Sequence, residues 1–535
     1  MKRPSLVFVS CLLLCALLAG CVPSQAAGPA TATTGPAPGG TSSGGPSAPA
    51  AIRRGGTLHV GLNADLTTMD PAMSSAQVDR QVYQSIYNSL LRLDKDLSIK
   101  PELADKYEFT DPTTLVLTLH EGIKFQDGTD FNAQAVKVNF DRMLDKATNS
   151  PRASEIATVK EVVAADDHTV KLMLKQPDAA LLSQLTDRAG MMVSPAAIQK
   201  YGKDLARNPV GTGPFQFVEW VKDDHLTVKK SSGYWEKGAD GQPLPYLDQI
   251  IYKPVTDATV RLTGLKTGTL DIIDQVAPKD APGLRTQNAL KFDELPGLGY
   301  QGLELNNRKA PFDKAAVRQA VDYAIDREAI AKNVLLDTVT PGAGPIPPGS
   351  WAYDASVAQF AHDPAKAKQL LQQAGLALPV SFSCYVVNTP EQIRLAQAYK
   401  QQLAEGGLDM QIELLEFGTA LSKYNNFEHT CFQIGWSGRA DPDGNTYSFL
   451  HTGGGQNKDQ YANSQVDQLL EQARSTYDQA RRKTLYSQAL KIAIDEGAID
   501  YLYWPLDQKT WTPKLQGFVH TADGMIRLKA AWLSQ

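Results

Sequence analysis

The sequence predicts an α/β protein whose folded body is divided into two or three packed lobes. About 480 residues follow an apolar leader and a polar tether, and a body of that length exceeds what one hydrophobic core supports. Strand-like runs at 380–387, 410–417 and 430–436 alternate with helical patterns, which is typical of a partly parallel sheet. In such sheets, ligands bind beyond the carboxyl ends of the strands.

The first half of the body is predicted to be rich in β-strands. Residues 55–62 form the predicted opening strand, and residues 222–224 form the predicted turn of a hairpin. A helix is expected from Asn132 onward, because its apolar residues fall on one face. The apolar residues behind these predictions are Leu115, Leu117 and Leu119; Val170, Leu172 and Leu174; Phe215, Phe217, Leu226 and Val228; and, in the helix, Val136, Phe140, Met143 and Leu144.

The second half has longer helices with clearer start and stop signals. Aspartate and serine side chains before a periodic apolar run predict helix starts, because their oxygens accept hydrogen bonds from the first free N–H groups. A proline at the first helical position and a glycine past the last one strengthen the prediction. The signals are Asp313 before Val317, Val321, Ala324 and Ile325; Asp363-Pro364, with Gly375 at the far end; and Ser464 with Asp467, a capping-box pattern, before Leu469 and Leu470.

The N-terminus resembles a bacterial lipoprotein signal that ends at Cys21. Lys2 and Arg3 supply a positive start, and residues 4–20 are apolar and uncharged. The run Leu18-Ala19-Gly20-Cys21 predicts cleavage before the cysteine, which would then carry lipid. The alternative is an ordinary cleaved signal with a chance cysteine. Residues 22–54 are dominated by Ala, Gly, Pro, Ser and Thr and are predicted to be a disordered linker between the anchor and the body.

Charge and cysteine content narrow the class of function. Without Lys2 and Arg3, 51 basic residues stand against 58 acidic ones, a net charge of −7 with no basic stripe, which argues against a nucleic-acid partner. No second long apolar run follows the leader, so the body is not expected to span a membrane. The sequence leaves open whether Cys384 and Cys431, the two cysteines of the body, form a disulfide or are buried free thiols.

Five groups of residues spread over the body together resemble one protein family. They are residues 103–104 with 115–119, 121–128 and 131; residues 208–215; Leu265 with Gly268 and Asp271; residues 306–325; and residues 435–443. On these residues, the chain resembles the extracytoplasmic solute-binding proteins of the peptide, oligopeptide and nickel ABC-importer family, solute-binding family 5. His120 departs from the Lys or Arg that is usual after the strand at 115–119.

The resemblance implies a two-lobed, periplasmic-binding-protein-like clamp with an extra subdomain in the first lobe. The hinge would lie at two chain crossings, near Lys253-Pro254-Val255 and near Pro505, and ligand contacts with both lobes would favour the closed state. The implied ranges are 55–256 for lobe one, with the subdomain at about 87–207; 257–506 for lobe two; and 507–535 for a C-terminal return to lobe one.

The resemblance also implies a function outside the cytoplasm. The chain would be the lipid-anchored binding component of an ABC importer, a monomer without cofactor or catalytic activity that delivers peptides or related small solutes to permease subunits. The alternatives on the same fold are a binding protein for an opine-like, glycan or other anionic solute, and a sensing receptor. An anchored hydrolase is disfavoured, because the sequence offers no set of nucleophile, base and orienting group.

The loop at 435–443 carries the candidate ligand site. In peptide-binding members of the family, the third residue after the tryptophan is an aspartate that pairs with the peptide's α-ammonium group, whereas this chain has Arg439. A guanidinium repels an ammonium group and suits a carboxylate or phosphate, so we expect an acidic or neutral hydrogen-bonding ligand group there. The alternative is an internal ion pair of Arg439 with Asp441 or Asp443. The candidate ligand-binding residues are Met69, Trp351, Trp436, Arg439, Asp441 and Tyr447.

Two further patterns are not expected to form sites. Residues 297–302 have the glycine spacing of a dinucleotide-binding loop, but a strand follows where a phosphate-binding helix is required. Asp441, Asp443 and Asn445 match the start of a calcium-binding loop, which then lacks the required glycine and glutamate. The histidines are scattered, so the sequence predicts no metal site.

Overall fold

The computed structural model describes residues 52–357 and 360–534. The predicted signal peptide, Cys21 and the linker up to residue 51 lie outside these residues. The described body is built on a 12-stranded sheet. Its strands are β1 (Thr57–Leu62), β8 (Phe215–Val221), β9 (His225–Lys230), β10 (Gln249–Pro254), β11 (Ile272–Asp274), β12 (Lys291–Pro296), β13 (Tyr300–Leu305), β14 (Val339–Pro341), β15 (Val380–Val387), β16 (Leu408–Leu415), β17 (Cys431–Trp436) and β18 (Asp500–Trp511).

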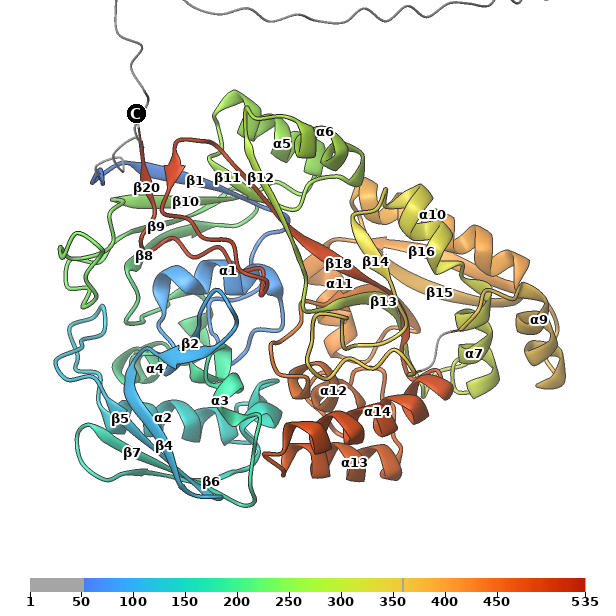
Figure 1. Ribbon diagram of the computed structural model, residues 1–535, viewed down its shortest axis with the longest axis horizontal. Helices are drawn as coiled ribbons and strands as arrows, with labels where there is room; N and C mark the ends of the chain where they lie inside the picture. Colours follow the sequence, from blue (N-terminus) through green and yellow to red (C-terminus); the bar gives the residue numbers. More distant parts are fainter. Residues whose placement is uncertain (1–51, 358–359, 535) are drawn as a thin grey trace, which may run out of the picture. The chain divides into compact units, whose positions relative to one another are not determined.

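The sheet mixes parallel and antiparallel neighbours. Its order is β16-β15-β17-β13-β18-β11-β1-β10-β9-β8, and β12 and β14 also pair with β18 (Figure 1). β1 is parallel to β10 and β11, whereas β8 and β9 form an antiparallel hairpin, so the predicted opening strand and hairpin are confirmed. β15 is parallel to both β16 and β17, which confirms the partly parallel sheet predicted for the second half.

Strand β18 belongs to both halves of the sheet. Between Asp500 and Pro505 it pairs with β13 and β14, and between Leu506 and Trp511 it pairs with β12 and β11. Figure 1 shows it in red in the middle of the body. The change of partners at Pro505 coincides with one of the two predicted lobe crossings.

The other predicted crossing, near Lys253, is not supported by the strand pairings. β11 and β12 follow it in the chain, yet both lie in the half of the sheet that contains β1. The chain leaves this half only between β12 and β13, at residues 297–299. The lobe boundaries stay predictions, and the pairings favour a first crossing at residues 297–299.

A separate small layer forms the predicted extra subdomain, at the lower left of Figure 1. It has a four-stranded antiparallel sheet in the order β4-β5-β7-β6 and a hairpin of β2 and β3. The predicted apolar faces are confirmed, because Leu117, Val170 and Phe140 all belong to one buried core. The elements are β2 (Leu91–Leu93), β3 (Ile99–Pro101), β4 (Ala104–Asp111), β5 (Thr114–Leu119), β6 (Val159–Ala164), β7 (Thr169–Leu174) and α2 (Ala133–Leu144).

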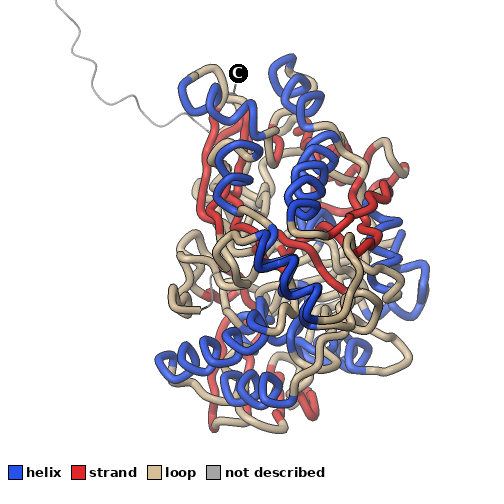
Figure 2. The backbone as a smooth tube through the Cα atoms, turned by 90° about the vertical axis from the view of Figure 1, so that its right-hand side faces the viewer, coloured by secondary structure: helices blue, strands red, loops and turns tan. Residues whose placement is uncertain are grey.

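Helices pack on both faces of the second half of the sheet, and Figure 2 shows helices in blue against strands in red. Alternate residues of β15 reach two different cores: Cys384 and Val386 pack with α7, α9 and α10, whereas Tyr385 packs with α11 on the other face. The remaining helices are α1 (Gln77–Ile86), α3 (Leu181–Gln184), α4 (Pro195–Tyr201), α5 (Ala258–Thr267), α6 (Ala281–Thr286), α7 (Ala315–Ala324), α8 (Arg327–Ala329), α9 (Pro364–Gln373), α10 (Pro390–Glu405), α11 (Phe417–Asn425), α12 (Asp443–Leu450), α13 (Ser464–Arg474) and α14 (Gln479–Asp495).

Short elements complete the body. Helical turns occur at Ala153–Ile156, Arg188–Gly190, Gly202–Arg207, Pro278–Asp280 and Ile330–Val334, and a last pair of strands comprises β19 (Leu515–Gln516) and β20 (Trp532–Leu533). In the part of the chain that the structure describes, no helix has both the length and the apolar character needed to cross a bilayer.

The predicted helix starts are confirmed at two places and wrong at two others. Asn132 caps α2, and Asp363 caps α9 by accepting from the Lys366 amide. Asp313 does not cap α7, which begins after Lys314 without a side-chain cap. α13 is capped by Asn463 rather than Ser464, because an asparagine side chain one residue earlier reaches the same N–H groups.

The two cysteines of the body form a disulfide. Cys384 on β15 and Cys431 on β17 are direct partners in the parallel ladder, and their sulfurs are bonded. Both residues are fully buried in the core beneath α7, α9 and α10. The question that the sequence left open is therefore answered in favour of pairing.

Candidate functional site

Residues from both halves of the sheet line a cavity of about 640 Å³. In the half that contains β1, the lining includes residues 63–65 after β1, Thr256 after β10 and Asp274 at the end of β11. Each of these parallel strands therefore ends at the cavity. This is the edge of a parallel sheet at which the sequence predicts a ligand.

The other half contributes the ends of its own parallel strands. Residues 387–389 end β15 and start α10, residues 416–417 follow β16, and residues 434–437 end β17. The connection between β12 and β13 and the central part of β18 also line the cavity. A ligand bound here would touch both halves of the sheet, which is the geometry that allows a ligand to stabilise a closed clamp.

Carboxylates outnumber cationic side chains in the wall of the cavity. A cleft lined by one sign of charge raises the local concentration of ligands that carry the other sign. The carboxylates are Asp65, Asp223, Asp274, Glu391, Glu416, Asp507 and Asp523, and the cationic side chains are Arg261 and Arg394.

Most of these carboxylates already have partners inside the protein. Asp65 accepts from Trp220 Nε1 at 3.0 Å, and Asp507 lies 2.5 Å from Lys509 Nζ. Burial alone raises the pKa of Asp523, but Arg527 and a hydroxyl hydrogen bond outweigh burial and lower that pKa to about 2. Asp523 is therefore ionised at neutral pH and paired within its own segment.

Trp436, a predicted ligand residue, lines the cavity as the last residue of β17. Only 6% of the residue is exposed, and its Nε1 atom donates to Asn445 Oδ1 at 3.1 Å. The ring meets Phe449 edge-on and has the Arg439 guanidinium over it at 4.2 Å from the ring centre. Trp436 thus holds the loop in place and also presents a surface to the cavity; its ligand contact stays a prediction.

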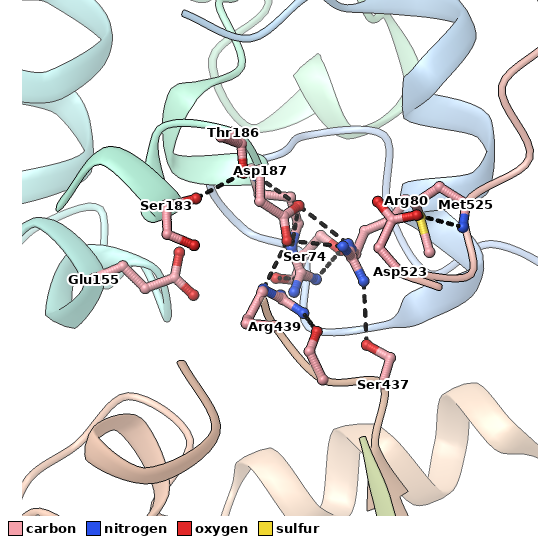
Figure 3. A network of polar contacts seen from close by, with 12 residues as sticks. Ser74, Arg80, Glu155, Ser183, Thr186, Asp187, Ser437, Arg439, Asp523 and Met525 are labelled. Atoms are coloured by element: carbon pink, nitrogen blue, oxygen red, sulfur yellow. Dashed lines mark hydrogen bonds and ion pairs between the residues drawn. The ribbon is translucent and has the colours of Figure 1, made fainter. Parts of the chain in front are cut away.

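Arg439 is not among the residues that line the cavity, and its side chain meets Asp187 (Figure 3). Its Nε atom lies 2.7 Å from Asp187 Oδ2, and both side chains are buried. The backbone before it has φ of +82° at Gly438, where a Cβ would come within 2.1 Å of the Leu298 carbonyl carbon. Only glycine fits that approach, so Gly438 fixes the direction in which Arg439 leaves the loop.

Asp187 caps the helical turn at Arg188–Gly190 and is surrounded by three guanidinium groups. Arg80 on α1 contacts both of its oxygens at 3.0 Å and also donates to Ser437 Oγ at 3.2 Å. Burial raises the pKa of Asp187, but Arg439, Arg80 and Arg188 together hold it well below the ordinary range. The aspartate is therefore ionised and joins the segment before Arg188–Gly190 to the 435–443 loop.

The alternative expectation for Arg439, an ion pair with Asp441 or Asp443, is wrong. Asp441 forms a two-pronged ion pair with Arg482, at 2.7 and 2.9 Å, and Asp443 forms another with Arg474. Both aspartates are thus neutralised by α13 and α14, which leaves Asp187 as the partner of Arg439. The same two pairs engage the carboxylates that a calcium-binding loop would need as ligands.

The remaining candidate residues do not line the cavity. Met69 is fully buried in the core beside α1, and its carbonyl accepts from Tyr87 Oη at 2.7 Å. Trp351 packs near Tyr486, and Tyr447 lies under the Arg474 guanidinium and stacks on His451. Their ligand contacts, like those of Arg439 and Asp441, stay predictions.

The structure adds residues that the sequence did not single out. Asp187 and Arg80 become visible only when distant segments meet, and Asp274 ends the short strand β11, which was not predicted from the sequence. Gln433 of β17 also lines the cavity, and its Nε2 donates to the Gln392 carbonyl at 3.1 Å. Among residues 52–357 and 360–534, no group of three or more His, Cys, Asp and Glu side chains is arranged to hold a metal ion.

Comparison with known proteins gives consistent matches. The family model of bacterial extracellular solute-binding proteins, family 5, matches residues 98–457. The glutathione-binding protein GsiB of Escherichia coli K12 is 35% identical over 451 residues, which cover 82% of this chain and 86% of that protein.

Solved structures agree with the sequence relatives. The ABC transporter-associated periplasmic binding protein DppA of Helicobacter pylori, in complex with the peptide STSA, matches with a TM-score of 0.83 and 26% identity. The binding protein AgaA of A. tumefaciens R10, in complex with agropinic acid, matches with a TM-score of 0.83 and 28% identity. Each alignment covers 90% of this chain and 99% of the other chain.

These likenesses confirm the predicted two-lobed α/β clamp, and the relatives are binding proteins rather than enzymes. Binding proteins of this kind act outside the cytoplasm and deliver their ligands to ABC permeases. The chain therefore belongs to the bacterial extracellular solute-binding proteins of family 5.

Proposed function

We propose that this protein is the lipid-anchored binding component of an ABC importer for short peptides of the size of glutathione. The observation that carries the proposal is the 35% identity with glutathione-binding proteins over 82% of the chain. The cavity of about 640 Å³ supports it, because this volume lies in the usual range for small-molecule sites.

The proposed mechanism is closure of the two halves of the sheet over the solute. The chain crosses between the halves at residues 297–299 and in β18 near Pro505, and both segments line the cavity. A few residues at such crossings can absorb the rotation of one lobe against the other. Trp436 would pack against an apolar part of the ligand, because it ends β17 at the cavity wall.

A second candidate ligand is an anionic, opine-like solute. The 28% identity with a binding protein solved in complex with agropinic acid favours it. Arg439, in place of the aspartate usual in peptide-binding members, is consistent with such a ligand. The buried ion pair of Arg439 with Asp187 argues for the peptide, because this guanidinium is already neutralised.

Calorimetric titration with a small ligand panel tests the function. The panel contains reduced glutathione, di- to pentapeptides, the N-acetylated form of each, and agropinic acid. We expect micromolar or tighter binding of glutathione or a short peptide, with stabilisation of about 2.7 kcal/mol at 100 times the dissociation constant. Binding of agropinic acid alone would favour the second candidate, and binding of no panel member would refute the proposal.

The lipid anchor rests on the sequence around Cys21, which lies outside the described residues. Replacing Cys21 by serine is expected to release the protein from the membrane fraction, because the residue that would carry the lipid is lost. Fractionation followed by immunoblotting checks the location, and calorimetry checks that ligand affinity is unchanged. A Cys21→Ser protein that stays in the membrane fraction contradicts the anchor.

A further inference from the structure

Asp274, the last residue of β11, carries a buried carboxylate with no partner. The residue is 3% exposed, and its Oδ1 atom is buried without a hydrogen-bond partner. Neither of its oxygens has a cationic partner within 4.0 Å among the residues that the structure describes. An unpaired buried carboxylate costs several kcal/mol or shifts its pKa, so folding alone gives no reason for it.

The nearest cationic groups are engaged elsewhere. Arg261 on α5 donates to backbone carbonyls, to that of Val255 at 2.5 Å, of Asp274 at 3.2 Å and of Gln275 at 2.9 Å. Lys509, the cross-strand neighbour of Asp274, directs its ammonium to Asp507 at 2.5 Å. The carboxylate of Asp274 is therefore left without a counter-ion among the described residues, and the residue lines the cavity.

Burial of Asp274 changes the pKa of its carboxyl group. It raises the pKa of Asp274 above the ordinary value, and Lys509 and Arg261 lower that pKa only in part. A cationic ligand group placed against the carboxylate would lower that pKa and stabilise the ionised form.

A second unpartnered acceptor lies in the opposite half of the sheet. Gln433 on β17 is 4% exposed and lines the cavity, and its Oε1 atom is buried without a hydrogen-bond partner. An ammonium group has three donors and no acceptor, so it suits an acceptor that has no donor of its own. A ligand rich in N–H donors can therefore satisfy groups in both halves at once.

We propose that Asp274 receives the α-ammonium group of the solute, so that this protein selects ligands with a free amino group. This inference rests on the proposed function, because it assigns a subsite within the same cavity. It also assigns the ammonium contact to a different wall from the 435–443 loop, where Arg439 stands in place of an aspartate.

The test compares reduced glutathione with N-acetyl-glutathione on the full chain and on Asp274→Asn. Wild type is expected to lose about 30-fold or more in affinity on acetylation, as when a buried charge pair loses one partner. Asp274→Asn is expected to bind glutathione about 30-fold more weakly and to distinguish the two ligands by less than about threefold. The unliganded variant should melt no lower than wild type, because an unpaired buried charge has been removed.

Asp271→Asn is the matched control. It makes the same substitution three residues earlier, where the carboxylate accepts from the His59 amide at 2.8 Å outside the cavity. This variant should keep the preference for free amines. If glutathione binds and Asp274→Asn keeps that preference, this inference is refuted and the proposed function stands; if wild type binds no free-amine member of the panel, both fail.

Discussion

Replacing Asp187 by asparagine is expected to lower the unfolding free energy by about 3–5 kcal/mol, the usual cost of removing one partner of a buried ion pair. The substitution keeps the shape of the side chain but removes the charge that faces Arg439, Arg80 and Arg188. These arginines are between 1% and 7% exposed, so water cannot replace the lost carboxylate. Chemical denaturation of wild type and variant measures the difference.

A double-variant cycle separates the pair from its surroundings. Asp187→Asn with Arg439→Gln is expected to lose less than the sum of the two single variants, because each single variant leaves an unpaired group behind. Coupling of at least about 1 kcal/mol is expected for side chains in direct contact. Effects that add within about 0.5 kcal/mol would show that Arg439 and Asp187 do not stabilise each other.

The stabilisation that Asp187 provides is expected to depend on pH, and Asp187→Asn tests this. Because the pKa of Asp187 is depressed in the folded protein, its stabilisation is complete well above the unfolded-state value of about 3.9. The stabilisation is lost progressively as the pH falls below that value. The difference in stability between wild type and Asp187→Asn should therefore shrink between about pH 5 and pH 3. A difference that stays constant over this range would mean that the charge of Asp187 is not its source.

Loss of the Cys384–Cys431 disulfide is also expected to lower the free energy of unfolding by several kcal/mol. The bond joins residues separated by 47 positions, and a crosslink of that span stabilises by about 4 kcal/mol in the chain-entropy model. Replacing both cysteines by alanine should lower the unfolding free energy by about that amount without reductant. Cys384 and Cys431 both lie fully buried in one core, where alanine leaves a small cavity in addition.

A reductant provides the matched control. Wild type unfolded in the presence of reductant should approach the double-alanine variant, since the crosslink is then absent from both. Peptide mapping by mass spectrometry without reduction should recover one peptide pair joined through Cys384 and Cys431. Recovery of two free thiols at these positions, with equal stability of wild type and variant, would contradict a structural disulfide.

The sequence predicted the architecture well because periodic apolar residues and strand-ending signals are local. The alternation in β5 and β7 and the Asp363-Pro364 start of α9 each depend on neighbouring residues only. The cap at Ser464 failed because Asn463 competes for the same N–H groups one residue earlier. The pairing of β11 and β12 with β18 could not be predicted, because nothing local in their sequences marks it.

The candidate site was predicted only in part. The carboxyl ends of parallel strands gave the place of the cavity, and Trp436 lies in its wall. The partner of Arg439 could not be predicted, because Asp187 is 252 positions away and carries no motif. Asp274 was equally hidden, since its missing partners are a property of packing and not of sequence.

Capture of a short peptide between the two halves of the sheet is the central proposal for this protein. A crystal structure of the protein with the tightest-binding member of the ligand panel tests this most directly. The predicted result is a ligand inside the cavity, in contact with Trp436 and with its amino group about 3 Å from Asp274. A ligand bound outside the cavity, or touching only one half of the sheet, would contradict it.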